Sequence, residues 1–307
     1  MRQATEIDVI IMVYKPDKKF TRLLRGLKNQ TIVPKRILLL NTGKQYWKEE
    51  WIQGIPEAEV YHIKEEEYDH GGTRRYGAEL STAPYMVFMT QDAVPANARL
   101  LDRLMQSMKD PQVAVAYARQ IPYTDCNPVD AYSRGFNYPK ESKKKTKADI
   151  ETMGIKAFFC SDVCAIYRKS DYVQLGGFPE KTIFNEDMIF ARKVLEAGKA
   201  IYYASEARVY HSHNDNCRKQ LQRSFDLAVS QKQNPTIFKG IVSESEGIRM
   251  VKAVSEHLVK TGKWYWAPRL YISSIVKYIG FLLGKNYNKL PKGWVLKLTD
   301  NKRYWSK

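Results

Sequence analysis

Short apolar runs alternate, in the first third of the chain, with stretches whose apolar residues recur every three or four positions. The clearest runs are Val9–Val13, Ile37–Leu40 and Tyr85–Met89, with Val60–Ile63 as a weaker one. Runs of this length are typical of strands buried on both faces. Between the first two runs, the spacing of Phe20, Leu23, Leu24 and Leu27 predicts a helix with one apolar face. Alternating strands and helices predict an α/β fold of three layers around a mostly parallel sheet.

The pattern becomes less regular after residue 100. Leu100–Met108 has helical spacing and Val113–Tyr117 reads as a further strand. Asn185 is a suitable N-cap for a helix that would end near Gly198. The segment Lys140–Lys147 is polar and basic, and we expect it to form an exposed loop. From Lys219 onward the pattern is helical.

Polar side chains stand where several of these elements begin or end. Asn41 and Asp92 each follow an apolar run, and His211 and His213 follow the short apolar stretch Val209–Tyr210. In open α/β sheets, ligands bind beyond the carboxyl ends of the strands, so these side chains are candidates for a binding site. Taken singly, each has an ordinary structural explanation, such as a turn at Asp92 or a pair of surface histidines.

Composition adds constraints on the class of protein. Hydrophobic residues make up 44% of the chain, enough for a large core, and the net charge is +17. The surplus is concentrated at the end, where residues 257–307 hold eleven Lys or Arg and one acid, Asp300. Such a tail suits an anionic membrane surface, an acidic substrate or nucleic acid, but no nucleic-acid-binding motif is visible and we therefore expect no nucleic-acid partner.

The cysteines and the hydropathy give further limits. The four cysteines are too sparse for a disulfide framework, and the pair Cys160 and Cys164 is half of a zinc site whose other half is missing. We expect buried thiols in a reduced cytoplasmic protein. The most apolar segment, Leu270–Leu283, has 14 residues and contains Lys277, so it is too short and too charged to cross a bilayer.

Four short motifs in a fixed order resemble a known family. They are "HGGTRRYGA" at residues 70–78, "TQDA" at 90–93, "FNEDMIFARK" at 184–193 and "HSHN" at 211–214. Together they resemble the family 2 glycosyltransferases of the GT-A fold, and among them the bacterial rhamnosyltransferases of cell-wall and O-antigen polysaccharide synthesis. The resemblance covers residues 6–230. It implies a GT-A type α/β/α sandwich over residues 1–230, with the nucleotide-sugar part in about 1–120 and the acceptor part in about 121–230, followed by a basic, amphipathic helical extension at 231–307.

The resemblance also implies a metal site. Asp92 stands at the last acid of the family's Asp-x-Asp motif and would hold Mg²⁺ or Mn²⁺ against the donor's diphosphate, whose departing charge needs a counter-ion. Thr90 replaces the first acid of the motif. His211 or His213 would supply a further ligand or a phosphate contact.

Two acids match the position of the catalytic base in the family. The acceptor hydroxyl must lose a proton as it attacks the sugar, and a carboxylate within hydrogen-bond reach can take it. Asp187 matches the base, and Glu186 would orient the acceptor. A carboxylate at a helix start also has a purely structural explanation, because it interacts favourably with the helix dipole.

The donor-binding residues implied by the resemblance are Tyr14, Asn41, Arg74, Gln91 and Asp92. Tyr14 lies in the turn that contacts the base in the family, and Asn41 replaces an Asp there. Arg74 would pair with the diphosphate. The implied reaction is inverting transfer of L-rhamnose from dTDP-L-rhamnose to an undecaprenyl-diphosphate-linked saccharide. Use of a UDP-linked sugar, or loss of catalysis in a scaffold, are the alternatives.

The C-terminal segment has two interpretations. Ile272, Ile275, Ile279 and Leu282 share one face of a predicted helix, and Trp and Tyr residues flank it. One interpretation is packing on the catalytic domain or on another subunit of a homo-oligomer. The other is an interfacial helix lying on an anionic leaflet, which would place the protein peripherally on the inner face of the cell membrane.

Overall fold

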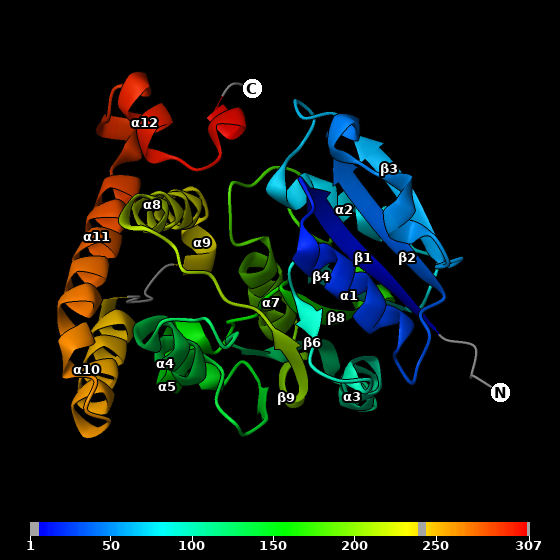
Figure 1. Ribbon diagram of the computed structural model, residues 1–307, viewed down its shortest axis with the longest axis horizontal. Helices are drawn as coiled ribbons and strands as arrows, with labels where there is room; N and C mark the ends of the chain where they lie inside the picture. Colours follow the sequence, from blue (N-terminus) through cyan, green and yellow to red (C-terminus); the bar gives the residue numbers. More distant parts are fainter. Residues whose placement is uncertain (1–5, 239–243, 306–307) are drawn as a thin grey trace. The chain divides into compact units, whose positions relative to one another are not determined.

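The computed structural model describes residues 6–238 and 244–305, which form two compact units. The first unit contains the chain up to Ile121 together with Tyr138–Lys181 and Glu186–His211. The second contains Pro122–Asn137, Thr182–Asn185 and the chain from Ser212 onward. The predicted division at residue 231 between the sandwich and the helical extension stays a prediction. Figure 1 shows the elements of both units.

A nine-stranded sheet forms the centre of the first unit. Its parallel part has the order β3 (Ala58–Ile63), β2 (Arg36–Thr42), β1 (Ile7–Tyr14) and β4 (Tyr85–Thr90), which lie side by side in Figure 1. The order then continues through β8 (Cys164–Arg168), β6 (Val113–Ile121), β9 (Ala200–Tyr210) and β5 (Val94–Pro95). The ninth strand, β7 (Lys143–Lys145), pairs with β9.

The sheet is mixed, because β8 runs antiparallel between β4 and β6. β6 and β9 are parallel to each other, and β5 and β7 are antiparallel to β9. The predicted α/β class and the parallel first half are confirmed. The antiparallel pairings were not predicted, since the partner of a short apolar strand is not encoded in its own residues.

Helices cover both faces of this sheet, which gives the expected three layers. The helices of the first unit are α1 (Lys18–Lys28), α2 (His70–Leu80), α3 (Leu100–Ser107), α5 (Asp149–Met153), α6 (Lys169–Gln174) and α7 (Glu186–Glu196). The predicted stripe of α1 is buried with Val9, Ile11 and Val13 of β1. On the opposite face, α2 approaches β1 and β2 at Gly77, where an added Cβ would lie 2.6 Å from Ile10 Cγ2. Glycine permits this close approach.

The basic segment at residues 140–147 is not the exposed loop predicted from its composition. Lys143–Lys145 forms β7, and Lys145 is buried. Its ammonium donates hydrogen bonds to the carbonyl oxygens of Lys156 (3.0 Å) and Phe159 (2.5 Å), which replace the water it loses. Burial lowers the pKa of Lys145 to about 7. Cys160 and Cys164 are free and buried, as expected.

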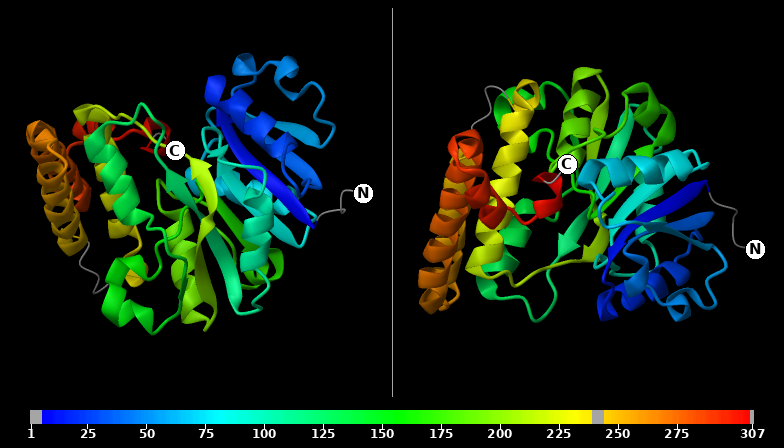
Figure 2. Two further views of the ribbon diagram at one scale, coloured as in Figure 1. Left: turned by 60° about the horizontal axis from the view of Figure 1, so that its bottom comes forward. Right: turned by 90° about the horizontal axis from the view of Figure 1, so that it is seen from above.

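The second unit is built from helices. They are α4 (Pro128–Asn137), α8 (Cys217–Gln233), α9 (Pro235–Phe238), α10 (Glu244–Lys260), α11 (Ala267–Lys285) and α12 (Lys292–Leu298). α8 and α11 lie side by side, as the right-hand view of Figure 2 shows in yellow and orange. Gly280 and Gly284 of α11 face the backbone of α8 at Leu221 and Phe225. Within the described ranges, no helix has the combination of length and hydropathy that a bilayer crossing requires.

The close packing of α8 on α11 predicts the effect of adding one methyl group. In Gly284→Ala the new Cβ would lie 2.7 Å from Ala228 Cβ and in conflict with the Phe225 carbonyl, so the two helices must move apart. We expect a loss of about 1–3 kcal/mol in the free energy of unfolding, measured by urea denaturation.

The matched control is Gly247→Ala on α10, where an added Cβ meets nothing within 4 Å. Because alanine is the better helix former, this change should leave stability unchanged or raise it by roughly 0.5–1 kcal/mol. Equal denaturation midpoints for Gly284→Ala and the unmodified chain would contradict the packing described.

Candidate active site

A buried arginine lies between two buried carboxylates in the first unit. Arg74 extends from α2, and its Nε is 3.1 Å from Glu186 Oε1 and 3.5 Å from Asp162 Oδ2. All three side chains are at most 5% exposed. An arginine side chain stays protonated in proteins, so the guanidinium supplies a fixed positive charge to both acids.

Glu186, the first residue of α7, is enclosed on its other side by His70. His70 Nδ1 lies 2.7 Å from Glu186 Oε2. Burial alone would raise the pKa of Glu186, but Arg74 and His70 outweigh it and lower the pKa to about 2. Glu186 is therefore an ionised carboxylate that contacts Arg74 and His70, both on α2. These contacts favour a role in holding α2 and α7 together and not a contact with the acceptor.

Asp187 is placed differently although it is the next residue. Its side chain is half-buried, whereas that of Glu186 is buried. Its Oδ2 accepts a hydrogen bond from the backbone amide of Asp162 (3.2 Å) and its Oδ1 one from the amide of Met188 (2.7 Å). Burial, followed by the negative charges of Glu186 and Asp162, raises the pKa of Asp187 well above its ordinary value. Two adjacent carboxyls thus have pKa values displaced in opposite directions, an arrangement typical of acid–base sites.

Asp162 completes this group, and the sequence pattern did not single it out. It precedes β8 and accepts a short hydrogen bond from the Tyr167 hydroxyl (2.5 Å). Burial raises its pKa to about 7, with Arg74 opposing the shift. The residue lies inside the segment Phe158–Tyr167, whose apolar residues predict a strand. The polar interruption at Ser161 and Asp162 in that segment is the signal that would have found it.

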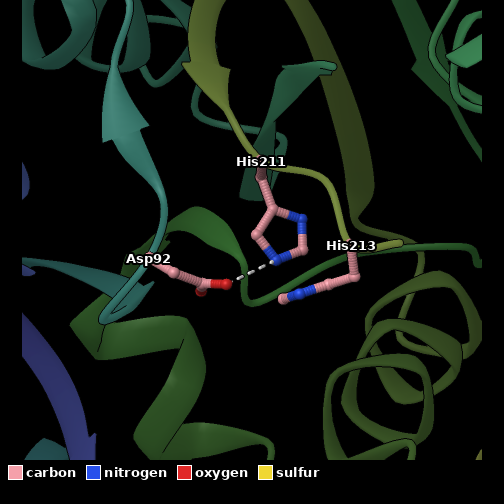
Figure 3. A group of neighbouring side chains, drawn as sticks. All are labelled: Asp92, His211 and His213. Carbon is pink, nitrogen blue, oxygen red and sulfur yellow. Dashed lines mark ion pairs between the residues drawn. The ribbon is translucent and has the colours of Figure 1, made fainter. Parts of the chain in front are cut away.

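A second group of side chains joins Asp92 to the histidines. Asp92 follows β4, and its Oδ2 lies 3.5 Å from Nε2 of His211, the residue after β9. His213 is two residues further along the same segment, so the chain itself keeps it near His211. One ligand atom from each of the three lies within 4.8 Å of the others, as Figure 3 illustrates. One carboxylate oxygen and two imidazole nitrogens are a plausible ligand set for Mn²⁺, which accepts both donor types.

The predicted donor-binding residues Tyr14 and Gln91 contact each other. The Gln91 amide accepts a hydrogen bond from the Tyr14 backbone N–H and donates one to the Tyr14 carbonyl, both at 2.8 Å. The Tyr14 ring is exposed and meets the ring of Tyr46 edge-on, with centroids 5.7 Å apart. Lys15 places its ammonium 4.7 Å from the centre of the Tyr46 ring. The carboxyl end of β1 therefore presents two aromatic rings and one cation.

Asn41, near the carboxyl end of β2, is buried and is not exposed beside these rings. The side chain is fully buried, and its Nδ2 donates to the Gly43 carbonyl at 3.2 Å and lies 3.0 Å from His62 Nδ1. Asn41 therefore shapes the turn at Gly43 that leads to Tyr46. Its contact with a nucleotide base, implied by the family resemblance, stays a prediction.

Comparison with known sequences places the chain among glycosyltransferases. The family model described as glycosyl transferase family 2 matches residues 8–176. The O-antigen chain rhamnosyltransferase RfbN of Salmonella typhimurium is 35% identical over 303 residues, which cover 98% of this chain and 96% of that protein. The O-antigen chain rhamnosyltransferase WbaN of Salmonella anatum is 39% identical over 246 residues, 80% of this chain and 78% of that one.

Solved structures show the same fold at low identity. The mannosyltransferase PcManGT of Pyrobaculum calidifontis, in complex with GDP-Man and Mn²⁺, aligns with 98% of this chain and 83% of its own at a TM-score of 0.56 and 14% identity. TarS of S. aureus, residues 1–349, aligns with 93% of this chain and 91% of its own at a TM-score of 0.53 and 15% identity. These likenesses confirm the GT-A type fold. By its family model and by its identity to two relatives over most of its length, the chain belongs to glycosyl transferase family 2.

Proposed function

We propose that this chain is an inverting rhamnosyltransferase that moves L-rhamnose from dTDP-L-rhamnose to a lipid-linked saccharide during O-antigen synthesis. The observation that carries the proposal is the 35% identity to an O-antigen chain rhamnosyltransferase over 98% of the chain. The half-buried Asp187 supports it, because a carboxylate with a raised pKa is a suitable base for attack by a hydroxyl.

Asp187 acts as the base in this proposal. The acceptor oxygen forms a bond to C1 of rhamnose while the bond from C1 to the diphosphate breaks, and the electron pair leaves with dTDP. The hydroxyl proton passes to the ionised carboxylate of Asp187. Attack from the face opposite the leaving group inverts the anomeric centre. The backbone amides of Asp162 and Met188 fix the carboxylate for this step.

The contacts of Arg74 favour a different role from the one implied by the resemblance. Its Nε faces Glu186 and Asp162, and the side chain is about 5% exposed. We assign it to the support of the acidic group and not to the diphosphate. Without it, two buried carboxylates would lose their counter-charge, which typically destabilises a protein by about 3–5 kcal/mol.

The diphosphate end of the donor is assigned to Asp92, His211 and His213. These residues would hold a divalent cation, with Mn²⁺ favoured over Mg²⁺ because two of the three donors are imidazole nitrogens. When bound, the cation stabilises the negative charge that builds up on the departing diphosphate. A single carboxylate with two histidines replaces the paired acids of the Asp-x-Asp motif, which accounts for Thr90 at the other acid position.

We assign the nucleotide base to the exposed ring of Tyr14 at the end of β1 and to the half-buried ring of Tyr46, which follows β2. Tyr14 and Tyr46 offer aromatic faces and edges on which a pyrimidine can pack. Gln91 acts indirectly, because both polar atoms of its amide bind the Tyr14 backbone. Nothing in this arrangement separates thymine from uracil, so a UDP-linked sugar is the alternative donor.

The acceptor's lipid leads us to propose a membrane contact through α11. Tyr271, Ile272, Ile275, Tyr278, Ile279 and Leu282 are exposed on this helix at helical spacing. Trp264, Tyr265 and Trp294 are exposed nearby in the chain, among the lysines and arginines of the tail. Apolar side chains flanked by aromatic and basic residues are typical of helices that lie in the interface of anionic membranes.

Replacement of the base predicts the loss of transfer. With dTDP-L-rhamnose, Mn²⁺ and a lipid-linked acceptor, Asp187→Asn should lower kcat roughly 10²–10⁴-fold, because the amide cannot take the proton. Product formation is followed by mass spectrometry. The control is Asp8→Asn, a buried acid that accepts hydrogen bonds from Ser81, Thr82 and Ala83. The control should lose stability but keep kcat, and retention of wild-type kcat by Asp187→Asn would refute the assignment.

Charges placed on α11 should release the protein from membranes. Ile275 and Ile279 are 57% and 44% exposed. In flotation with vesicles that contain anionic lipid, the double change Ile275→Glu and Ile279→Glu should at least halve the bound fraction. Val173→Glu, at an apolar side chain of α6 that is 64% exposed, should bind like the unmodified chain. If the double variant floats as well as the control, α11 does not contact the membrane.

A further inference from the structure

A buried glutamine of β6 contacts the inner side of His211. Gln120 is 2% exposed, and its Oε1 lies 2.9 Å from His211 Nδ1. Its Nε2 donates to the hydroxyl of Tyr138 at 2.5 Å and to that of Ser161 at 3.0 Å. The three partners come from the segment after β9, from the segment after α4 and from the segment before β8, so this one amide joins distant parts of the first unit.

With the amide of Gln120 oriented as the structure has it, its contacts place the hydrogen of His211 on Nδ1. Both donor positions of the amide are used by the two hydroxyls, and its oxygen faces Nδ1. An oxygen can only accept, so the Nδ1 it faces must donate. In a neutral imidazole, Nε2 then has a lone pair. That nitrogen is directed at Asp92, with 3.5 Å between Nε2 and Oδ2 (Figure 3).

This tautomer suits a cation better than a direct hydrogen bond. A neutral histidine that bonded Asp92 directly would need its hydrogen on Nε2. With the hydrogen on Nδ1, the Nε2 lone pair is directed at the Asp92 carboxylate, and both atoms can be ligands of a cation between them. Histidines that bind metals usually donate their other N–H to an acceptor, which fixes the ring and raises its basicity.

We propose that Gln120 is a positioning residue of the cation site, which holds His211 with its hydrogen on Nδ1 and its Nε2 lone pair towards Asp92. The inference rests on the metal site of the proposed function and adds a residue outside the ligand set. Gln120 also bonds Ser161, the residue before Asp162, whose amide donates to Asp187. One buried amide therefore supports the segments that carry the cation site and the base.

The tautomer is measured directly on the unmodified, metal-free protein. With ¹⁵N-labelled histidine, NMR separates a protonated from an unprotonated ring nitrogen. We expect His211, assigned by its loss in His211→Asn, to carry its hydrogen on Nδ1. This readout needs no variant of Gln120 and no catalysis. A hydrogen on Nε2 would overturn the inference.

Cation affinity provides the second measurement. Mn²⁺ is titrated alone and with dTDP, and the free ion is followed by electron paramagnetic resonance. Gln120→Met keeps the volume but removes the acceptor, and should weaken Mn²⁺ binding roughly 10–100-fold. Gln120→Glu keeps an oxygen opposite Nδ1, and the hydroxyls of Tyr138 and Ser161 can rotate to donate. The Gln120→Glu variant should retain the Mn²⁺ affinity of the unmodified protein within a few-fold.

The matched control is a buried glutamine elsewhere in the same unit. Gln30 donates to the carbonyls of Gly26 and Asn97 and accepts from the amide of Leu101. Gln30→Met should cost comparable stability and leave Mn²⁺ affinity unchanged.

The outcomes separate the inference from the function on which it rests. If the unmodified protein binds Mn²⁺ and Gln120→Met binds it equally well, the inference is wrong and the cation site stands. If Gln30→Met weakens binding as much as Gln120→Met does, the effect is general destabilisation and the inference is again wrong. If the unmodified protein binds no Mn²⁺ under either condition, the cation site fails and the inference fails with it.

Discussion

The charge of Arg74, buried with Glu186 and Asp162, is the constraint on which the candidate active site depends. A guanidinium at this depth is tolerated only with anions beside it, and the carboxylates need it equally. Because the three residues come from α2, the start of α7 and the segment before β8, their pairing fixes these elements against one another. Asp187 follows Glu186 directly, so the same pairing fixes its position, and burial followed by the charges of Glu186 and Asp162 raises its pKa.

The two groups of polar side chains divide the work that glycosyl transfer requires. In the proposed mechanism, the group around Asp187 accepts a proton, and the group around Asp92 holds the cation that meets the negative charge of the leaving diphosphate. Gln120 contacts segments that lead to both. The neutral Thr90 and Gln91 beside Asp92 fit this proposed division, because Gln91 bonds the Tyr14 backbone and the two histidines would supply the ligands that a second acid would otherwise provide.

The sequence predicts those features that local pattern determines. The strands at Val9–Val13 and Tyr85–Met89 and the helix stripe of Phe20 are confirmed, and Asp92 does meet His211. The features it does not predict depend on contacts across the fold. Lys145 looks like part of a solvated basic run, but it is buried with its ammonium hydrogen-bonded to two carbonyls of a later segment and to the hydroxyl of Tyr117. Gln120 lies beyond the predicted strand Val113–Tyr117 and Asp162 lies within a strand-like segment, and their importance arises only from their partners.

The pH dependence of rhamnosyl transfer tests the central claim that Asp187 is a base whose pKa is raised by burial and by Glu186. Asp187 must be ionised to act, so kcat/KM should fall as the pH drops through its raised pKa, well above the ordinary value of about 4. Glu186→Gln removes a negative charge beside Asp187 and should shift that acidic limb to lower pH. The account would be contradicted if the acidic limb of kcat/KM lay at the same pH in Glu186→Gln and the unmodified protein, or if neither showed an acidic limb above about pH 4.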